Sequence, residues 1–278
     1  MQHRDSVTTQ VNPVQEGTTS SERRQSVWGA RELLWALVAR NLRMRYQRSM
    51  LGFLWVLLNP LLTTLILVGV FRYVLRIQVE QYWTFFLSGY FAWVFVVHSV
   101  TACAGTIRDH SYMTRTLAFP ADVLVLSTLA SRVIEFAIEI VLVAVVLAVF
   151  RHGGVPIAYA FLPLAVLLVA GVALAIAYPV AALSVFFKDA EFALPVSFTL
   201  LGYLSPVFYP LSLVPEAWRT VYSLNPLVGI LELFHTILYE GRIPPGRDVL
   251  VSATIVAVSL AVGVRLFRWK RDLFAEIV

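Results

Sequence analysis

Long apolar runs separated by short charged connections are the feature that most limits how this chain folds. The runs cover approximately residues 51–75, 83–105, 120–151, 157–187, 194–208 and 249–267. A helix needs about 20 apolar residues to cross a ~30 Å hydrocarbon core, and its backbone groups are then satisfied internally. With 59% hydrophobic residues among 278, the chain is also too apolar for a soluble domain. We therefore predict an all-α polytopic membrane protein with six transmembrane helices.

The first 50 residues have a different composition. Residues 1–27 are polar and contain no apolar run, which predicts a disordered tail. Residues 28–50 repeat apolar side chains every three or four positions, with arginines on the other face. This pattern predicts an amphipathic interface helix before the transmembrane domain of residues 51–278. Two explanations of its basic face are open. One is anchoring to anionic lipid headgroups, and the other is a functional role of the arginines.

Prolines interrupt the apolar chain before the last run. The stretch 227–239 is too short to cross a bilayer, so we predict that residues 215–239 form re-entrant helices on the outer side. Glu232 and His235 make one ExxH pair there. A di-metal site between helices needs two such motifs and further carboxylates. The sequence therefore predicts no metal site.

The charges indicate how the chain is oriented. Six crossings place both termini on one side, and most Lys and Arg gather on that side, which predicts cytoplasmic termini. Within the run 120–151, Arg132, Glu135 and Glu139 share one helix face. A lone charge in the bilayer is costly. We therefore expect Arg132 to pair with Glu135, and Glu139 to face a polar cavity.

The chain lacks the sequence motifs of several classes of enzyme. The chain contains no GxxxxGK[ST] phosphate loop, no HExxH and no GxSxG. It therefore cannot hydrolyse ATP by the phosphate-loop route. The basic residues lie beside membrane spans, so they are interpreted as topology signals and predict no nucleic-acid partner.

The polar stretch 107–120 admits two interpretations. It is either an ordinary cytoplasmic loop or a docking element that offers polar contacts around exposed rings. A docking element would use five side chains in particular. These are Arg108, Asp109, Tyr112, Arg115 and Phe119.

Four segments in their order carry a family resemblance. They are RYQRSMLGFLWVLLNPL from residue 45, TLAFP from 116, FFKDAEF from 186 and SPVFYPLSLVPEAWRTVYSLNPL from 205. With the basic helix and the aromatic second run, this order resembles the permease subunit of type-2 ABC exporters. The resemblance is to the O-antigen, capsule, galactan and teichoic acid branch, and it covers about residues 34–271.

The resemblance implies an assembly and a location. Two copies of the chain would form a homodimer in the membrane lipids of the bacterial cytoplasmic membrane. Each would dock a separate cytoplasmic ABC ATPase subunit, which would hold ATP and Mg, so this chain would carry no cofactor. Residues 107–120 would be the coupling helix, residues 28–50 the gate helix, and residues 215–239 part of the outer gate.

The substrate implied is a lipid-linked polysaccharide. Its diphosphate would lie near Arg43, Arg45 or Arg48, because the arginine fork suits phosphate. Aromatic rings would offer faces to the sugars, although core packing or interface anchoring explains each ring as well. The candidate rings are Trp55, Tyr90, Phe91, Trp93, Tyr203, Phe208 and Tyr209. Trp83 and Phe86 are instead expected in an interfacial aromatic belt. The alternatives are a small-molecule exporter of the same superfamily and a membrane-embedded enzyme or scaffold.

Overall fold

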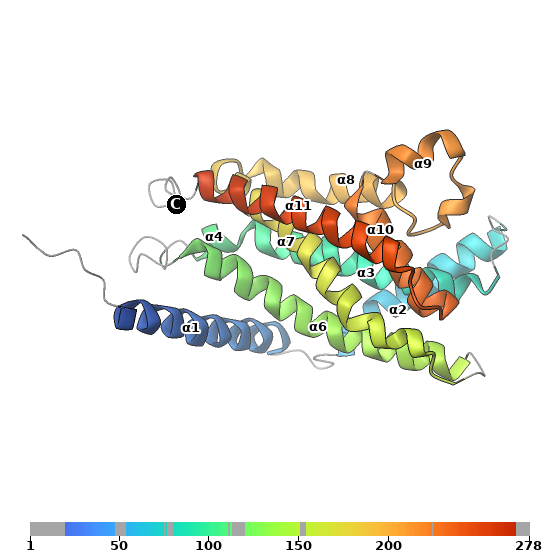
Figure 1. Ribbon diagram of the computed structural model, residues 1–278, viewed down its shortest axis with the longest axis horizontal. Helices are drawn as coiled ribbons and strands as arrows, with labels where there is room; N and C mark the ends of the chain where they lie inside the picture. Colours follow the sequence, from blue (N-terminus) through green and yellow to red (C-terminus); the bar gives the residue numbers. More distant parts are fainter. Residues whose placement is uncertain are drawn as a thin grey trace, which may run out of the picture.

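The computed structural model describes residues 20–47, 54–74, 76, 80–110, 112, 120–150, 154–223 and 225–270 (Figure 1). Within these ranges every regular element is a helix and no strand occurs. The prediction of an all-α fold is confirmed.

In the part of the chain that the structure describes, four helices are long and apolar enough to cross a membrane. They are α3 (Tyr82–Ala104), α6 (Ala121–Phe150), α7 (Leu162–Phe186, preceded by the 3-10 turn η2, Ile157–Phe161) and α11 (Gly246–Lys270). A fifth candidate is a bent pair, in which α9 (Glu216–Ser223) is followed by α10 (Pro226–Phe234) and η4 (His235–Glu240) across a 101° turn. Asn225 caps α10 by accepting a 3.0 Å hydrogen bond from the Leu227 N–H. The chain is thus a multi-pass membrane protein.

The other two predicted crossings are occupied by shorter helices. α2 (Leu54–Gly69) has 16 residues and continues into the π-helical turn η1 (Val70–Val74). α8 (Asp189–Tyr203) has 15 residues, or ~22 Å at 1.5 Å per residue, which is less than a ~30 Å core. An irregular stretch with the short turn η3 (Leu211–Leu213) follows it. The count of six crossings therefore stays a prediction.

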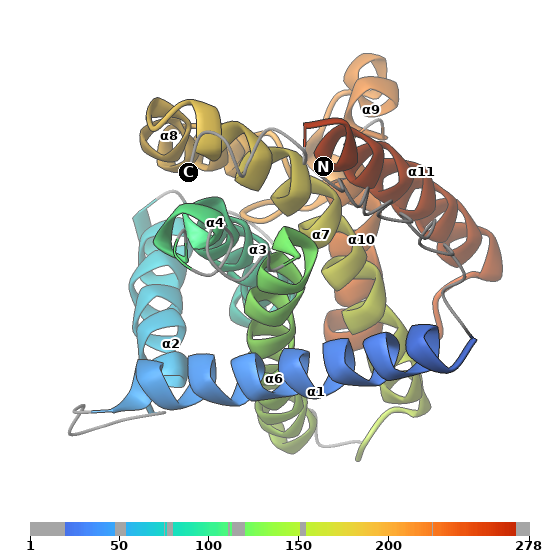
Figure 2. The same ribbon diagram turned by 90° about the vertical axis from the view of Figure 1, so that its left-hand side faces the viewer.

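Helix α1 (Ser20–Tyr46) lies across the end of the bundle and crosses α6 (Figure 2). It begins at Ser20, so residues 20–27 belong to this helix and not to the predicted tail. Leu37 and Val38 are buried, whereas Trp35 is 54% exposed. The apolar stripe of the sequence is therefore only partly covered by the bundle. Residues 1–19 lie outside the described residues.

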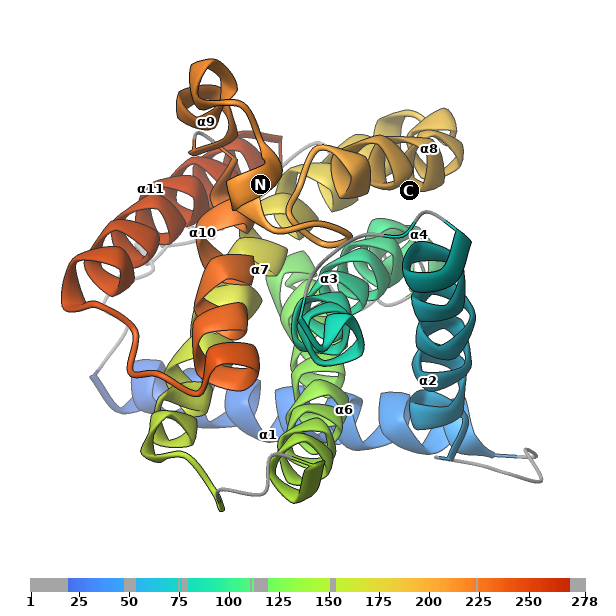
Figure 3. The ribbon, with the colours of Figure 1, turned by 90° about the vertical axis from the view of Figure 1, so that its right-hand side faces the viewer.

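The centre of the bundle is formed by α3, α6 and α7, with α2 and α11 on opposite sides (Figures 2 and 3). Phe86 is fully buried and stacks on Tyr90 with ring centroids 4.8 Å apart. The expectation that Phe86 belongs to an interfacial belt is therefore wrong. The sequence could not distinguish the two, because several rings in one turn of α3 point in different directions.

Helices α7 and α11 approach most closely at small residues. A Cβ added to Gly263 would overlap the Ala175 carbonyl oxygen, and one on Gly171 would lie 2.6 Å from Val256 Cγ1. Small residues let helix backbones pack closely, which is a main source of helix association in a bilayer. Glycine is therefore required at 263 by its backbone neighbour.

We expect Gly263→Ala to destabilise the chain by about 1–3 kcal/mol, the usual effect of overpacking. The added methyl meets a backbone oxygen that cannot rotate away, so α7 and α11 must separate. Thermal unfolding of the purified chain measures the effect. Gly69→Ala is the matched control, because nothing lies within 4 Å of its added Cβ. Equal unfolding midpoints for the two variants would contradict this packing.

Candidate functional site

A cavity of about 450 Å³ lies between α2, η1, α3 and α8, and aromatic rings form much of its wall. The lining residues are Leu67, Phe71, Tyr90, Trp93, Val97, Pro195, Phe198, Thr199, Gly202, Tyr203 and Phe208. Its size is within the usual range for small-molecule sites. Four of the seven predicted rings line it, from segments more than 100 residues apart in the sequence. These four are Tyr90, Trp93, Tyr203 and Phe208.

The rings of the wall pack in two groups. Phe208 stacks on Phe71 with centroids 5.8 Å apart and planes 7° apart, and Tyr203 lies 5.5 Å from Phe208. Trp93 meets Phe198 edge to face at 6.0 Å. Such a wall offers flat apolar faces together with phenol hydroxyls, which suits a ligand that has both apolar faces and hydroxyls. Phe71 and Phe198 were not predicted, because neither lies in an aromatic-rich stretch of the sequence.

A buried histidine fixes the loop that carries Phe208. The Nε2 of His235 donates to the Pro206 carbonyl at 3.0 Å, since that oxygen can only accept, and Nδ1 lies 2.8 Å from Ser88 Oγ. The imidazole also stacks on Phe85 at 4.1 Å. A Cβ on Gly89 would lie 2.6 Å from this ring. His235 therefore holds η4, α3 and the loop before Phe208 together.

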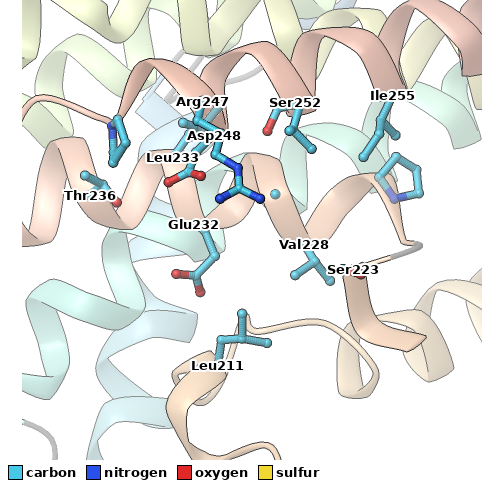
Figure 4. Close-up of a pocket in the computed structure, with 14 residues that line it drawn as sticks. Leu211, Ser223, Val228, Glu232, Leu233, Thr236, Arg247, Asp248, Ser252 and Ile255 are labelled. Atoms are coloured by element: carbon cyan, nitrogen blue, oxygen red, sulfur yellow. The ribbon is translucent and has the colours of Figure 1, made fainter. Parts of the chain in front are cut away.

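Glu232 and His235 do not converge on a common point. His235 is 4% exposed and engaged as above, while Glu232 lines a different cavity, beside α11 (Figure 4). Across the described ranges no three His, Cys, Asp or Glu side chains are grouped as metal ligands would be.

The remaining predicted rings lie outside the aromatic cavity. Phe91 is fully buried in the core, and Trp55 is 50% exposed on α2. The Tyr209 hydroxyl donates to the Tyr203 carbonyl at 2.6 Å and lies 2.9 Å from the Tyr222 hydroxyl. Tyr209 therefore donates within the chain and braces the loop behind the cavity.

The end of α1 is joined to α6 by an ion-pair network. Arg45 Nη1 and Arg132 Nη1 lie 2.6 and 3.2 Å from the same oxygen, Oε2 of Glu135. The predicted Arg132–Glu135 pair is confirmed. The Glu135 side chain is 5% exposed and that of Arg45 is 31% exposed. Arg43 is exposed, and Arg48 lies outside the described residues.

The segment after α3 makes polar contacts with α1, α7 and α8. α4 (Thr106–Asp109) carries Arg108, whose guanidinium pairs with Glu191 of α8 and donates to the Ser184 carbonyl at 3.3 Å. His110 Nδ1 lies 2.8 Å from the Thr106 carbonyl, and its Nε2 meets the guanidinium of Arg40 in α1.

Of the other four predicted docking residues, two are exposed and two lie outside the described residues. Asp109 and Tyr112 are exposed, Tyr112 by 71%. Arg115 and Phe119 lie outside the described residues. In the part of the segment that is described, Asp109 and Tyr112 are available to a partner, while Arg108 is used within the chain.

Comparison with known proteins gives concordant matches. The chain is similar to the O-antigen export system permease protein RfbA of Myxococcus xanthus, with 32% identity over 89% of this chain and 96% of the relative. It is 26% identical to RfbA of Klebsiella pneumoniae over 89% and 95% of the two chains. The polysialic acid transport protein KpsM of Escherichia coli is 24% identical over 85% and 93%. The family model for ABC-2 type transporters matches residues 32–239. On this coverage, the chain belongs to the ABC-2 type transporter family.

Proposed function

We propose that this chain is the permease subunit of an ATP-driven exporter that moves a lipid-linked polysaccharide across the bacterial cytoplasmic membrane. The observation that carries the proposal is the ring-lined cavity between α2, α3 and α8. Sugar rings have apolar faces that stack on aromatic side chains, and their hydroxyls bond to tyrosine. The names of the relatives, O-antigen export permease and polysialic acid transport protein, support the same substrate class.

The proposed topology has six crossings and cytoplasmic termini. α2 with η1, and α8 with the irregular stretch that follows, supply the two crossings beyond the four long helices. The pair α9 and α10 with η4 is re-entrant on the outer side, beside the exit of the pathway. Non-helical backbone at membrane depth is stable where protein or water covers it, and the His235 contacts support that placement.

Two copies of the chain are proposed to enclose the pathway, each docked to one ABC ATPase subunit. The exposed apolar side chains of α2 and α8 support a second copy on this face, next to the aromatic cavity. They include Leu65, Ile66, Val196, Leu200 and Tyr203. ATP and Mg would bind to the ATPase, because this chain lacks a phosphate loop.

The diphosphate of the substrate is proposed to bind at the end of α1, at Arg43, Arg45 and Arg48. Arg45 suits this role because Glu135 also pairs with Arg132. When Arg45 turns to a phosphate, the buried carboxylate keeps one cationic partner. The exchange therefore leaves no unpaired charge in the bundle.

The coupling contact with the ATPase is proposed at α4 and the residues after it. We expect Asp109→Ala with Tyr112→Ala to lower export at least tenfold while the assembled complex still hydrolyses ATP, because both side chains are exposed. Arg108→Ala is a poorer test, because it also breaks the pair with Glu191. The measurement is export and ATPase rate in the same vesicles. Unchanged export by the double variant would refute the docking assignment.

A small-molecule exporter is the second candidate function. The observation that favours it is an apolar cavity of about 440 Å³ on the side of the bundle, between the ends of α7 and α11 and including Phe187 and Trp269. Purified complex with its ATPase separates the two functions. Lipid-linked polysaccharide should stimulate hydrolysis, and Trp269→Ala should leave that stimulation unchanged. Stimulation by amphiphilic drugs alone, lost in Trp269→Ala, would favour the alternative.

A further inference from the structure

A further cavity, of about 400 Å³, lies where α10 and η4 meet the first turns of α11 (Figure 4). Its polar lining includes Glu232 and Thr236 from α10 and η4, and Arg247, Asp248 and Ser252 from α11. It shares no lining residue with the aromatic cavity. The function proposed above makes no use of it.

Three charged side chains border this cavity without being paired to one another. Glu232 is half-buried on α10, and Arg247 and Asp248 are exposed at the start of α11. Among the described residues, no ion pair or side-chain hydrogen bond engages any of the three. Nearby, Glu240 is paired with Arg242 at 2.7 Å. A partly buried carboxylate without a partner is costly, so the cavity favours a ligand that supplies a cation.

The walls of the cavity are closely packed. A Cβ added to Gly229 of α10 would lie 2.9 Å from Ser252 Oγ of α11. The two helices are therefore in contact directly behind the charged groups. A site whose walls are already in place loses less free energy to ordering when it binds a ligand.

The cavity continues onto an apolar surface. Val251 and Ile255 are among its lining residues, and on the same side of α11 Val251 is 49% exposed and Val258 is 59% exposed. In the apolar part of α11, only 17% of the residues are buried within the chain. In a bilayer, acyl chains cover such a surface, so a charged pocket at its end meets lipid headgroups.

We propose that this cavity binds a phospholipid whose headgroup carries a primary ammonium. Arg247 contacts the phosphate through its planar fork. Glu232 and Asp248 accept hydrogen bonds from the ammonium, and an acyl chain lies along Val251 and Val258 of α11. The guanidinium thus pairs with the phosphate, and the two carboxylates share the ammonium.

This chemistry sets an order of preference among headgroups. A quaternary ammonium has no N–H to donate to the two carboxylates, although it keeps its charge. A purely anionic headgroup would bring its phosphate beside Glu232 and Asp248 with no cation for them, and like charges repel. Phosphatidylethanolamine is therefore preferred to phosphatidylcholine, and both to phosphatidylglycerol.

Lipid binding is tested by native mass spectrometry of the full chain, purified with any subunits that remain attached. The protein is exchanged against mixed micelles containing equal amounts of the three lipids. We expect phosphatidylethanolamine to be retained at least tenfold over phosphatidylglycerol. Glu232→Gln should reduce this preference at least tenfold, whereas Arg247→Gln should weaken the retention of both lipids, because both carry the phosphate that Arg247 contacts. Arg265→Gln, an exposed arginine farther along α11, should leave it unchanged.

The wild-type protein alone can overturn the proposal, so a variant that fails to fold does not prevent a decision. Equal retention of phosphatidylethanolamine and phosphatidylcholine would refute recognition of the primary ammonium. Displacement of lipid by a soluble oligosaccharide at the same cavity would instead make it a saccharide site, which also overturns the proposal. Neither outcome depends on export or on ATP hydrolysis, so the proposed function is tested separately.

Discussion

Replacing Glu135 with glutamine is expected to destabilise the chain by about 3–5 kcal/mol, the usual effect of removing one partner of a buried ion pair. Glu135 is 5% exposed and is the shared partner of Arg45 and Arg132. Without its charge, the ion pairs with both Arg45 and Arg132 are lost, and α1 loses a polar attachment to α6. Because Arg45 is about one-third exposed, water offsets part of the loss, and the lower end of the range is expected.

The matched variant is Arg45→Gln, which leaves Glu135 paired with Arg132. Its effect should be about 1 kcal/mol or less, in keeping with a partly exposed pair. The unfolding midpoints of the two variants, measured on purified protein in one detergent, compare the contributions of Glu135 and Arg45 to stability. If Arg45→Gln lowered the unfolding midpoint more than Glu135→Gln, the Glu135 carboxylate would not be the group that joins α1 to α6.

Removing a ring from the aromatic cavity is expected to lower export about three- to tenfold per ring. Phe208→Ala removes stacking with Phe71 and Tyr203, and an aromatic pair contributes about 0.5–1.5 kcal/mol. Tyr203→Ala removes an exposed ring from the same wall. The measurement is the amount of polymer outside the membrane, together with the accumulation of lipid-linked precursor inside, in cells that carry only the variant chain.

Phe150→Ala is the control for ring loss. Phe150 is 60% exposed at the end of α6 and packs edge to face on Trp83, away from the aromatic cavity. Export should be close to wild type. A fall equal to that of Phe208→Ala, at matched protein levels, would show that the cavity has no special part in transport.

The sequence predicted the features that depend on local spacing. The four long helices follow from continuous apolar runs, and the Arg132–Glu135 pair follows from a separation of three residues on one helix. The contact of Arg45 with the same carboxylate joins positions 90 residues apart, and no local pattern encodes it. The Arg40–His110 contact, 70 residues apart, was missed for the same reason.

The aromatic cavity shows the same limit. Tyr90 and Trp93 are three residues apart and so face one way, and both line the cavity. Phe91 is next to Tyr90 in sequence, but one residue turns the helix by about 100°, and its ring lies in the core. Whether a ring faces a cavity depends on which helix packs beside it. For this reason Phe71 and Phe198 were not recognised, and neither was the bracing role of His235.

The close approach of α7 and α11 restricts how the protein can move. At Gly263 the backbone of α11 touches that of α7, and at Gly171 a side chain of α11 occupies the space of the missing Cβ. Two interlocked points on one helix pair oppose sliding along the common axis, which is how packed helices usually shear. Helices α7 and α11 therefore move together as one rigid unit. Any change between inward-open and outward-open states of the permease must come from movement of the other helices around them.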